Sequence, residues 1–137
     1  MKIRSFALAG LLWGGAAAAL AQDANGDAAA GQALFVSQCA YCHGLAASGD
    51  GPLAGALIIK PRDLTGLAAA NDGVFPVART VARIDGRQPL VSHGSPMPVF
   101  GSYFEGDPVM LRAETGQPIR ASQPIADLVA YLETLQK

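Results

Sequence analysis

The only two cysteines of this 137-residue chain stand three positions apart in the stretch SQCAYCHG, and a histidine follows them directly. Cys39, Cys42 and His43 form the spacing C-x-x-C-H, which is the pattern of covalent haem attachment. Two thiols at this spacing add across the two vinyl groups of one haem, and the next imidazole is then held against the iron. The stretch predicts thioether bonds from Cys39 and Cys42 and an axial iron ligand in His43.

Three other chemistries use the same residue types. A thioredoxin-like redox pair requires a βαβ setting, whereas a helix is expected before Cys39 and no parallel-sheet pattern is visible. A zinc site would have to recruit the distant His93 as its fourth ligand. A plain disulfide is the usual fate of exported cysteines, but it would leave the adjacent His43 without a role. Haem attachment accounts for all three neighbouring residues, and we favour it.

The N-terminus predicts export. Lys2 and Arg4 precede the apolar run FALAGLLWGGAAAALA, which ends in small residues at Ala19 and Ala21. This pattern is typical of a secretory signal peptide over residues 1–21, and the run is short for a membrane anchor. We therefore expect a single mature domain over residues 22–137, located in the periplasm and without stable membrane insertion.

Composition excludes some classes of function. The formal charge is −1, and loss of Lys2 and Arg4 with the signal peptide lowers it to −3. No basic run is present, so nucleic acid is not an expected partner. We find no nucleophile–base arrangement, no paired-carboxylate motif and no Gly-rich phosphate loop, so an enzyme is not expected. The 16 glycines and nine prolines predict a loop-rich domain, for which a covalent cofactor would supply the missing core.

Hydrophobic periodicity predicts a mainly helical domain. Asp27 or Asp23 is the expected N-cap of the first helix, and Gly31 within that helix indicates close approach of another backbone. Residues 87–106 show no period and are expected to form a long ordered loop. Alternation in PVMLRAETGQPIRAS predicts a small hairpin near residues 109–121. Helices are expected at about residues 28–39, 64–70, 74–86 and 123–135.

The chain resembles small monohaem c-type cytochromes of class I over nearly all of its mature length. GQALFVSQCAYCHG is similar to the family's N-terminal helix and haem motif, GSPMPVFG to its methionine loop, and IADLVAYLETL to its C-terminal helix. The resemblance implies an all-α, cytochrome c-like fold, with about four to five short helices and long loops around one covalent haem c. Leu128 and Tyr131 of the last helix would then cross the first helix at Gly31 and Phe35.

The resemblance also implies a second axial ligand and a partner for the proximal histidine. Met97, held between two prolines in an aperiodic loop, is the favoured ligand. His93 would give bis-histidine ligation, although it also fits a surface or haem-edge residue, and Met110 lies in an apolar alternation that favours core packing. Gly51-Pro52 lies where related cytochromes often place a proline whose carbonyl accepts a hydrogen bond from His43, and Pro61 is a rival for that role.

The haem propionates need hydrogen-bond donors. Lys60, Arg62, Arg83 and Arg87 are the cations available in this part of the sequence, although each would equally suit a solvated surface position. The only tryptophan lies in the signal peptide, so Tyr103 is the substitute donor. We place Pro52, Arg62, Arg83 and Tyr103 in contact with the haem.

Taken with the motif, the resemblance implies an electron carrier, expected to be a monomer that meets redox proteins transiently. Iron held by His43 and Met97 in a closed site changes oxidation state with little rearrangement, and a thioether ligand favours a fairly high potential. Two alternatives stay open. One is a haem subunit dedicated to a periplasmic oxidoreductase, and the long segment 102–122 is the feature that favours it. The other is a gas- or peroxide-binding haem protein with an open sixth site.

Overall fold

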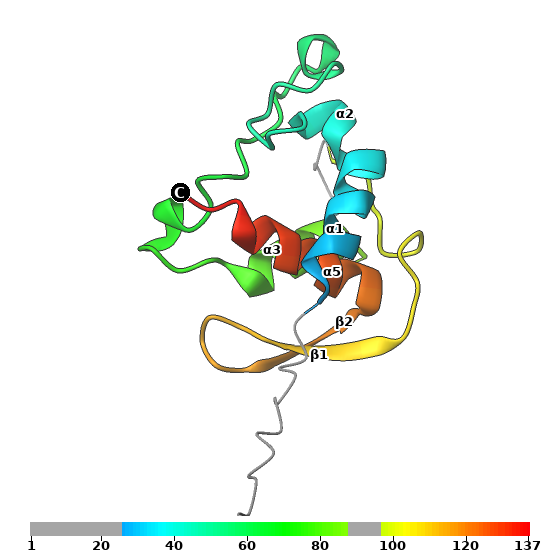
Figure 1. The fold of residues 1–137 in the computed structure, drawn as a ribbon, viewed down its shortest axis with the longest axis vertical. Coiled ribbons are helices and arrows are strands. Elements are labelled where there is room, and N and C mark those ends of the chain that lie inside the picture. The colour runs from blue at the N-terminus through cyan, green and yellow to red at the C-terminus, as the bar shows by residue number, and fades with distance from the viewer. Residues whose placement is uncertain (1–25, 88–96) are drawn as a thin grey trace, which may run out of the picture.

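The computed structural model of the chain describes residues 26–87 and 97–137. Figure 1 shows α1 and α2 as parts of one helical rod that α5 crosses, with the hairpin at one end of the molecule and residues 44–61 at the other. The predicted signal peptide and His93 lie outside the described residues. The elements are α1 (Ala28–Leu34), a π-helical turn (Phe35–Cys39), α2 (Ala40–His43), 3-10 turns (Ala54–Ala56 and Ala69–Asn71), α3 (Val77–Asp85), β1 (Pro108–Arg112), β2 (Pro118–Ser122) and α5 (Gln123–Thr134).

The start of α1 is fixed from two directions. Asp27 is its N-cap, as predicted, and its Oδ1 accepts hydrogen bonds from the N–H groups of Ala29 at 2.8 Å and Ala30 at 3.3 Å. The N–H of Asp27 donates to Oδ1 of Asp127 in α5, which also accepts from Nε2 of Gln123, both at 2.7 Å. Asp127 is buried, so these bonds offset the cost of removing its carboxylate from water.

The crossing of α1 and α5 occurs at Gly31, as the sequence predicts. A Cβ atom on Gly31 would collide with the backbone carbonyl of Asp127 and with Cβ of Tyr131. One turn further along, the rings of Phe35 and Tyr131 pack with centroids 5.4 Å apart and planes tilted by 53°. The missing side chain of Gly31 thus allows the two helices to approach closely enough for these rings to pack.

The hydrophobic core lies between these two helices, α3 and the hairpin. Phe35, Ile125 and Leu128 are among its largest fully buried side chains. Helix α5 lies within the expected range 123–135, and Ile125, Leu128, Val129 and Leu132 along it are all buried. Each such side chain contributes about 1.5–3 kcal/mol when fully buried, so α5 is a main source of stability for the elements packed on it.

Helix α3 begins later than the sequence pattern indicates, at Val77 rather than Val74. Val74 lies before the helix and is exposed. The chain enters the helix through Pro76, whose side chain makes no capping hydrogen bond. Oε2 of Glu114, in the hairpin loop, instead accepts a hydrogen bond from the N–H of Ala78 at 3.1 Å. Gly86 ends the helix in a left-handed conformation with φ 63°, as predicted.

The predicted hairpin is present, but the expected environment of one of its residues is wrong. β1 and β2 pair antiparallel, with Val109 opposite Ala121 and Leu111 opposite Ile119 on the inner face. Met110 points to the other face and is 52% exposed, so the expectation that it packs in the core is not met. Successive residues of a strand alternate between faces, and burial of Leu111 therefore places Met110 in solvent.

The helix expected over residues 64–70 is replaced by turns and a short 3-10 helix, Ala69–Asn71. A helix over these residues would pair the Leu64 carbonyl with the Ala68 N–H, and Gln136 binds both of these groups. Oδ1 of Asp63 accepts from both N–H and Oγ1 of Thr65, at 2.8 and 2.7 Å, as the N-cap of a helix would. The long-range bonds to Gln136 thus outcompete the helical pattern here.

The mainly helical, loop-rich architecture agrees with the fold expected from the sequence. The only sheet among the described residues is the two-stranded hairpin. Across residues 26–87 and 97–137, no helix has the length and apolar character needed to cross a membrane.

Substitution of Gly31 by alanine should destabilise the fold. The added methyl would collide with α5, at a cost of about 1–3 kcal/mol, which exceeds the roughly 0.5–1 kcal/mol that alanine gains over glycine within a helix. Denaturant unfolding of the haem-loaded protein measures the difference. Gly66→Ala is the matched control, because a Cβ there meets nothing within 4 Å. Unchanged stability of Gly31→Ala would show that the helices separate at no cost.

Substitution of Glu114 by glutamine should weaken the start of α3 in a pH-dependent way. The hydrogen bond from Ala78 holds the pKa of the Glu114 carboxyl below its ordinary value. The ionised Glu114 carboxylate therefore contributes its full stabilisation of the fold at pH values above the ordinary pKa of the group. This contribution is lost as the pH falls through the lowered pKa. At pH 7 we expect Glu114→Gln to cost roughly 0.3 kcal/mol, since the group is exposed and screened.

The difference between Glu114→Gln and wild type should disappear in acid, below the lowered pKa. Thermal unfolding of both proteins across pH measures it, and Glu105→Gln is the control that removes a carboxylate elsewhere. A difference that stays constant across pH would show that the charge of Glu114 has no part in capping α3.

Candidate functional site

The three motif residues occupy the C-terminal part of the helical rod. Cys39 ends the π-helical turn, while Cys42 and His43 form the last residues of α2. Both cysteines are unpaired thiols and partly buried, and Cys39 packs against the main core. Gly44 then ends the helix with φ 77°, a conformation that a residue with a side chain rarely adopts.

The π-helical turn was not foreseen from the sequence. Within it the N–H of Ala40 bonds to the carbonyl of Phe35, five residues back, instead of four. This wider turn rotates the motif relative to the face of α1 that packs on α5, because more residues fit in each turn. The wider turn thus sets the direction in which Cys39 and the residues after it point relative to Phe35, and no local sequence signal marks it.

The loop after the motif folds back onto the end of the helix. The N–H groups of Gly49, Gly51 and Leu53 donate to the carbonyls of His43, Cys42 and Tyr41, at 2.8, 3.1 and 2.9 Å. A Cβ on Gly51 would lie 2.5 Å from the Tyr41 carbonyl oxygen, so only glycine permits this approach. The last carbonyls of the helix, which lack helical partners, are thereby satisfied.

The imidazole of His43 is oriented by a backbone carbonyl. Its Nδ1 lies 3.0 Å from the carbonyl oxygen of Arg62, and a carbonyl only accepts, so Nδ1 carries the proton. Nε2 is then left with its lone pair, which is the form that binds a metal. Burial lowers the pKa of His43, and the bond to Arg62 opposes that shift, so the ring is neutral at pH 7.

The predicted acceptor for this bond was wrong. The sequence pointed to the carbonyl of Pro52, with Pro61 as the rival, whereas the carbonyl of Arg62 accepts the bond. Pro52 is exposed and lies in the loop that caps the motif helix. The segment before Arg62 comes close to His43 because Gly49 lies against the Pro61 carbonyl. Pro61, the rival candidate, directly precedes the observed acceptor Arg62, so this proline was a usable sequence signal for the position of the acceptor.

Met97 lies next to a well-anchored segment. It is partly buried and packs against the same core as Cys39. Beyond it, the N–H of Phe100 donates to the carbonyl of Ile84 at 3.2 Å, and the N–H of Gly101 donates to the carbonyl of Asp85 at 2.8 Å. The end of α3 therefore fixes the chain shortly after Met97.

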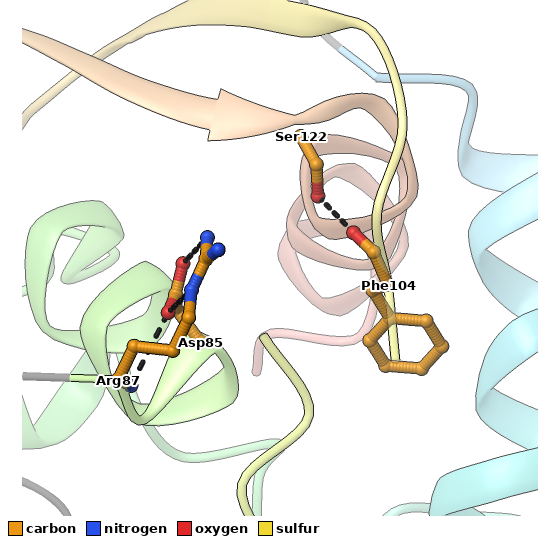
Figure 2. A network of polar contacts seen from close by, with 4 residues as sticks. All are labelled: Asp85, Arg87, Phe104 and Ser122. Atoms are coloured by element: carbon orange, nitrogen blue, oxygen red, sulfur yellow. Dashed lines mark hydrogen bonds and ion pairs between the residues drawn. The ribbon is translucent and has the colours of Figure 1, made fainter. Parts of the chain in front are cut away.

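Side chains strengthen this anchor. Arg87 binds Asp85 through Nε and a terminal nitrogen, both at 2.7 Å, and the pair lies against Gly101, where any Cβ would collide with it. Oγ of Ser122, at the start of α5, donates to the carbonyl of Phe104 at 2.6 Å. Figure 2 shows both contacts, from α3 and from the junction of β2 with α5. The chain that follows Met97 is thus held at two points, at Gly101 and at Phe104.

The described residues bear on the alternatives to haem attachment. Burial, and to a lesser degree the neighbouring Cys42, raises the pKa of Cys39 to about 11. A reactive redox cysteine has a lowered pKa, so a thioredoxin-like pair is disfavoured. Among residues 26–87 and 97–137, no group of three or more His, Cys, Asp or Glu side chains is placed to hold a metal ion.

The predicted propionate donors belong to three different segments of the chain. Arg62, Arg83 and Tyr103 are all exposed, and Arg62 contributes its backbone carbonyl to the site. Tyr103 packs edge-on against Phe104 with centroids 5.3 Å apart. Among the other cations, Lys60 donates to the carbonyls of Ala54 and Gly55. The contacts of these side chains with propionates stay predictions.

Comparison with known families decides the identity of the chain. The family model for cytochrome c matches residues 28–136. The chain belongs to the cytochrome c family. No curated protein and no solved structure matches it significantly. Membership implies a covalently attached haem c with its iron and a role in haem-based electron transfer.

The residues of this cytochrome fit such a haem. Two unpaired thiols, Cys39 and Cys42, lie three residues apart on one helix end. His43 follows with Nδ1 engaged and Nε2 available, and the partly buried Met97 offers a thioether from a separate, anchored segment. This donor set, two thiols with an imidazole and a thioether, is that of a c-type haem.

Removing the thiols tests the covalent attachment. We expect Cys39→Ala and Cys42→Ala each to keep haem through one remaining thioether, and the double variant to lose it on extraction with acidified acetone. Mass spectrometry of the unfolded chains, after expression in a host that attaches haem, measures the adduct. Ser37→Ala, a change on the same helix, is the control and should keep the full adduct. Covalent haem on the double variant would contradict the assignment.

Proposed function

We propose that this cytochrome c is a periplasmic one-electron carrier whose haem iron is held by His43 and Met97. The observation that carries the proposal is the geometry of His43, which follows the two thiols and has its Nδ1 proton engaged by the Arg62 carbonyl. When bound, the haem supplies the one-electron couple of its iron. The following roles belong to the residues of the chain.

His43 acts as a rigid axial donor. Its position is fixed by the end of α2, and its ring by the hydrogen bond to Arg62. The hydrogen bond donated by Nδ1–H to the Arg62 carbonyl makes the imidazole a stronger electron donor and prevents rotation of the ring. A ligand that does not move when the iron changes oxidation state keeps the reorganisation energy of electron transfer small.

Met97 is proposed as the second axial donor. The observations in its favour are its partial burial against the core and the backbone bonds that fix Phe100 and Gly101 to α3. A segment anchored in this way can hold a thioether against an iron without a large entropic cost. Met110, the other methionine of the described residues, is exposed on the outer face of the hairpin.

Partners are proposed to be redox proteins that dock transiently. Tyr41, Leu45 and Leu53 are exposed apolar side chains near the attachment motif, and a small patch of this kind suits a brief encounter. The N-terminal sequence KIRSFALAGLLWGGAAAALA supports export, since it has the basic start and apolar run of a signal peptide. The haem edge near the motif is the proposed route for the electron.

Carbon monoxide tests the closed site, because it binds ferrous haem only where the sixth position is open. We expect the visible spectrum of the dithionite-reduced wild type to be unchanged by carbon monoxide, and that of Met97→Leu to shift. Met110→Leu is the matched control, since it removes a methionine on the exposed hairpin face and should behave as wild type.

Two outcomes would change the proposal. A prompt shift in the wild type would mean an open or labile sixth position, and a gas- or peroxide-binding role would replace electron carriage. An unshifted Met97→Leu would mean that another residue occupies the iron.

A further inference from the structure

Gln136, two residues beyond the end of α5, uses its whole amide to bind a distant segment. Its Oε1 accepts a hydrogen bond from the N–H of Ala68 at 2.9 Å. Its Nε2 donates to the carbonyls of Leu64 at 2.9 Å and Leu132 at 2.7 Å. A flipped amide would place donor against donor and acceptor against acceptor, so the chemistry of the partners fixes the orientation.

These bonds immobilise the residues next to the partner of His43. Leu64 has its N–H bound to the carbonyl of Ala47 at 2.8 Å and its own carbonyl bound to Gln136. Both backbone groups of Leu64 are therefore engaged, two residues from the Arg62 carbonyl that orients the imidazole. The N–H of Lys137 adds a bond of 3.1 Å to the carbonyl of Thr65.

The segment has no regular structure of its own to hold it. Residues 60–63 have no regular structure, residues 64–68 form a bend and turns where a helix was expected, and Arg62 and Asp63 are exposed. The bond between Gln136 and the carbonyl of Leu132 places the amide directly on α5, which belongs to the hydrophobic core. Gln136 thus transmits the rigidity of the core to a loop that would otherwise depend on a few backbone bonds.

We propose that Gln136 is a positioning residue for the axial histidine: by fixing the segment around Leu64, it sets the strength of the hydrogen bond from His43 to Arg62, and with it the reduction potential of the iron. The inference rests on the proposed ligation by His43. A stronger bond makes the imidazole a better donor and favours the ferric state. Loosening the segment weakens the bond and raises the potential.

The test compares Gln136→Ala and Gln136→Met with the wild type, all loaded with haem. Methionine keeps the length of the side chain without its polar groups, and neither change alters the charge. Two quantities are measured: the reduction potential, by spectroelectrochemical titration, and the exchange rate of the His43 Nδ1 proton with solvent, by NMR of the reduced protein.

We expect both Gln136 variants to favour the ferrous state roughly threefold more than wild type at the same ambient potential, which is a rise of about 28 mV at 59 mV per decade. The His43 Nδ1 proton should exchange faster in both variants. Gln32→Ala is the matched control, because Gln32 is an exposed glutamine on α1, and it should match wild type in both measurements.

A merely structural role for Gln136 would lower the melting temperature of its variants while leaving the potential and the exchange rate of the His43 proton at wild-type values, and that result would overturn the inference. A wild type without a reversible one-electron couple would instead overturn the proposed function, and is recognised before any variant is compared.

Discussion

At Gly31 the backbone of α1 lies directly against Asp127 and Tyr131 of α5, and the attachment site depends on this contact. The approach allows Phe35 to pack on Tyr131, and the buried carboxylate of Asp127 ties down the residue that starts α1. Because the haem motif is the continuation of the same helical rod, its position relative to the core is set by this crossing. A side chain at position 31 would push the motif away from the core to which Met97 also belongs.

Helix α5 also constrains His43 through a second set of contacts. Its middle, at Asp127 and Tyr131, meets α1 at Gly31, while beyond its C-terminal end Gln136 binds the segment that carries the acceptor of His43. His43 is therefore constrained both through its own helix and through the carbonyl that accepts its hydrogen bond. The segment around residue 64 does not form the helix that its sequence favours, because Gln136 binds the Leu64 carbonyl and the Ala68 N–H, which a helix would have paired with each other.

The other side of the site is organised around α3. Its C-terminal end fixes the chain after Met97 through backbone bonds to Phe100 and Gly101, while its N-terminal end is capped by Glu114 from the hairpin. The hairpin within residues 102–122 therefore has a structural role. It supplies the cap that Pro76 cannot, and it covers the core with Leu111 and Ala121.

The sequence by itself determined the attachment motif, the cap at Asp27, the close approach at Gly31, the stripe of α5 and the hairpin, because each depends on residue types at short, regular spacing. Tertiary structure alone decided that Arg62 rather than Pro52 accepts the bond from His43, that Met110 faces solvent, and that a π-helical turn precedes the motif. These features arise from contacts between residues far apart in the chain, where a shift of one position changes which carbonyl or which face is presented, and local periodicity holds no information about that choice.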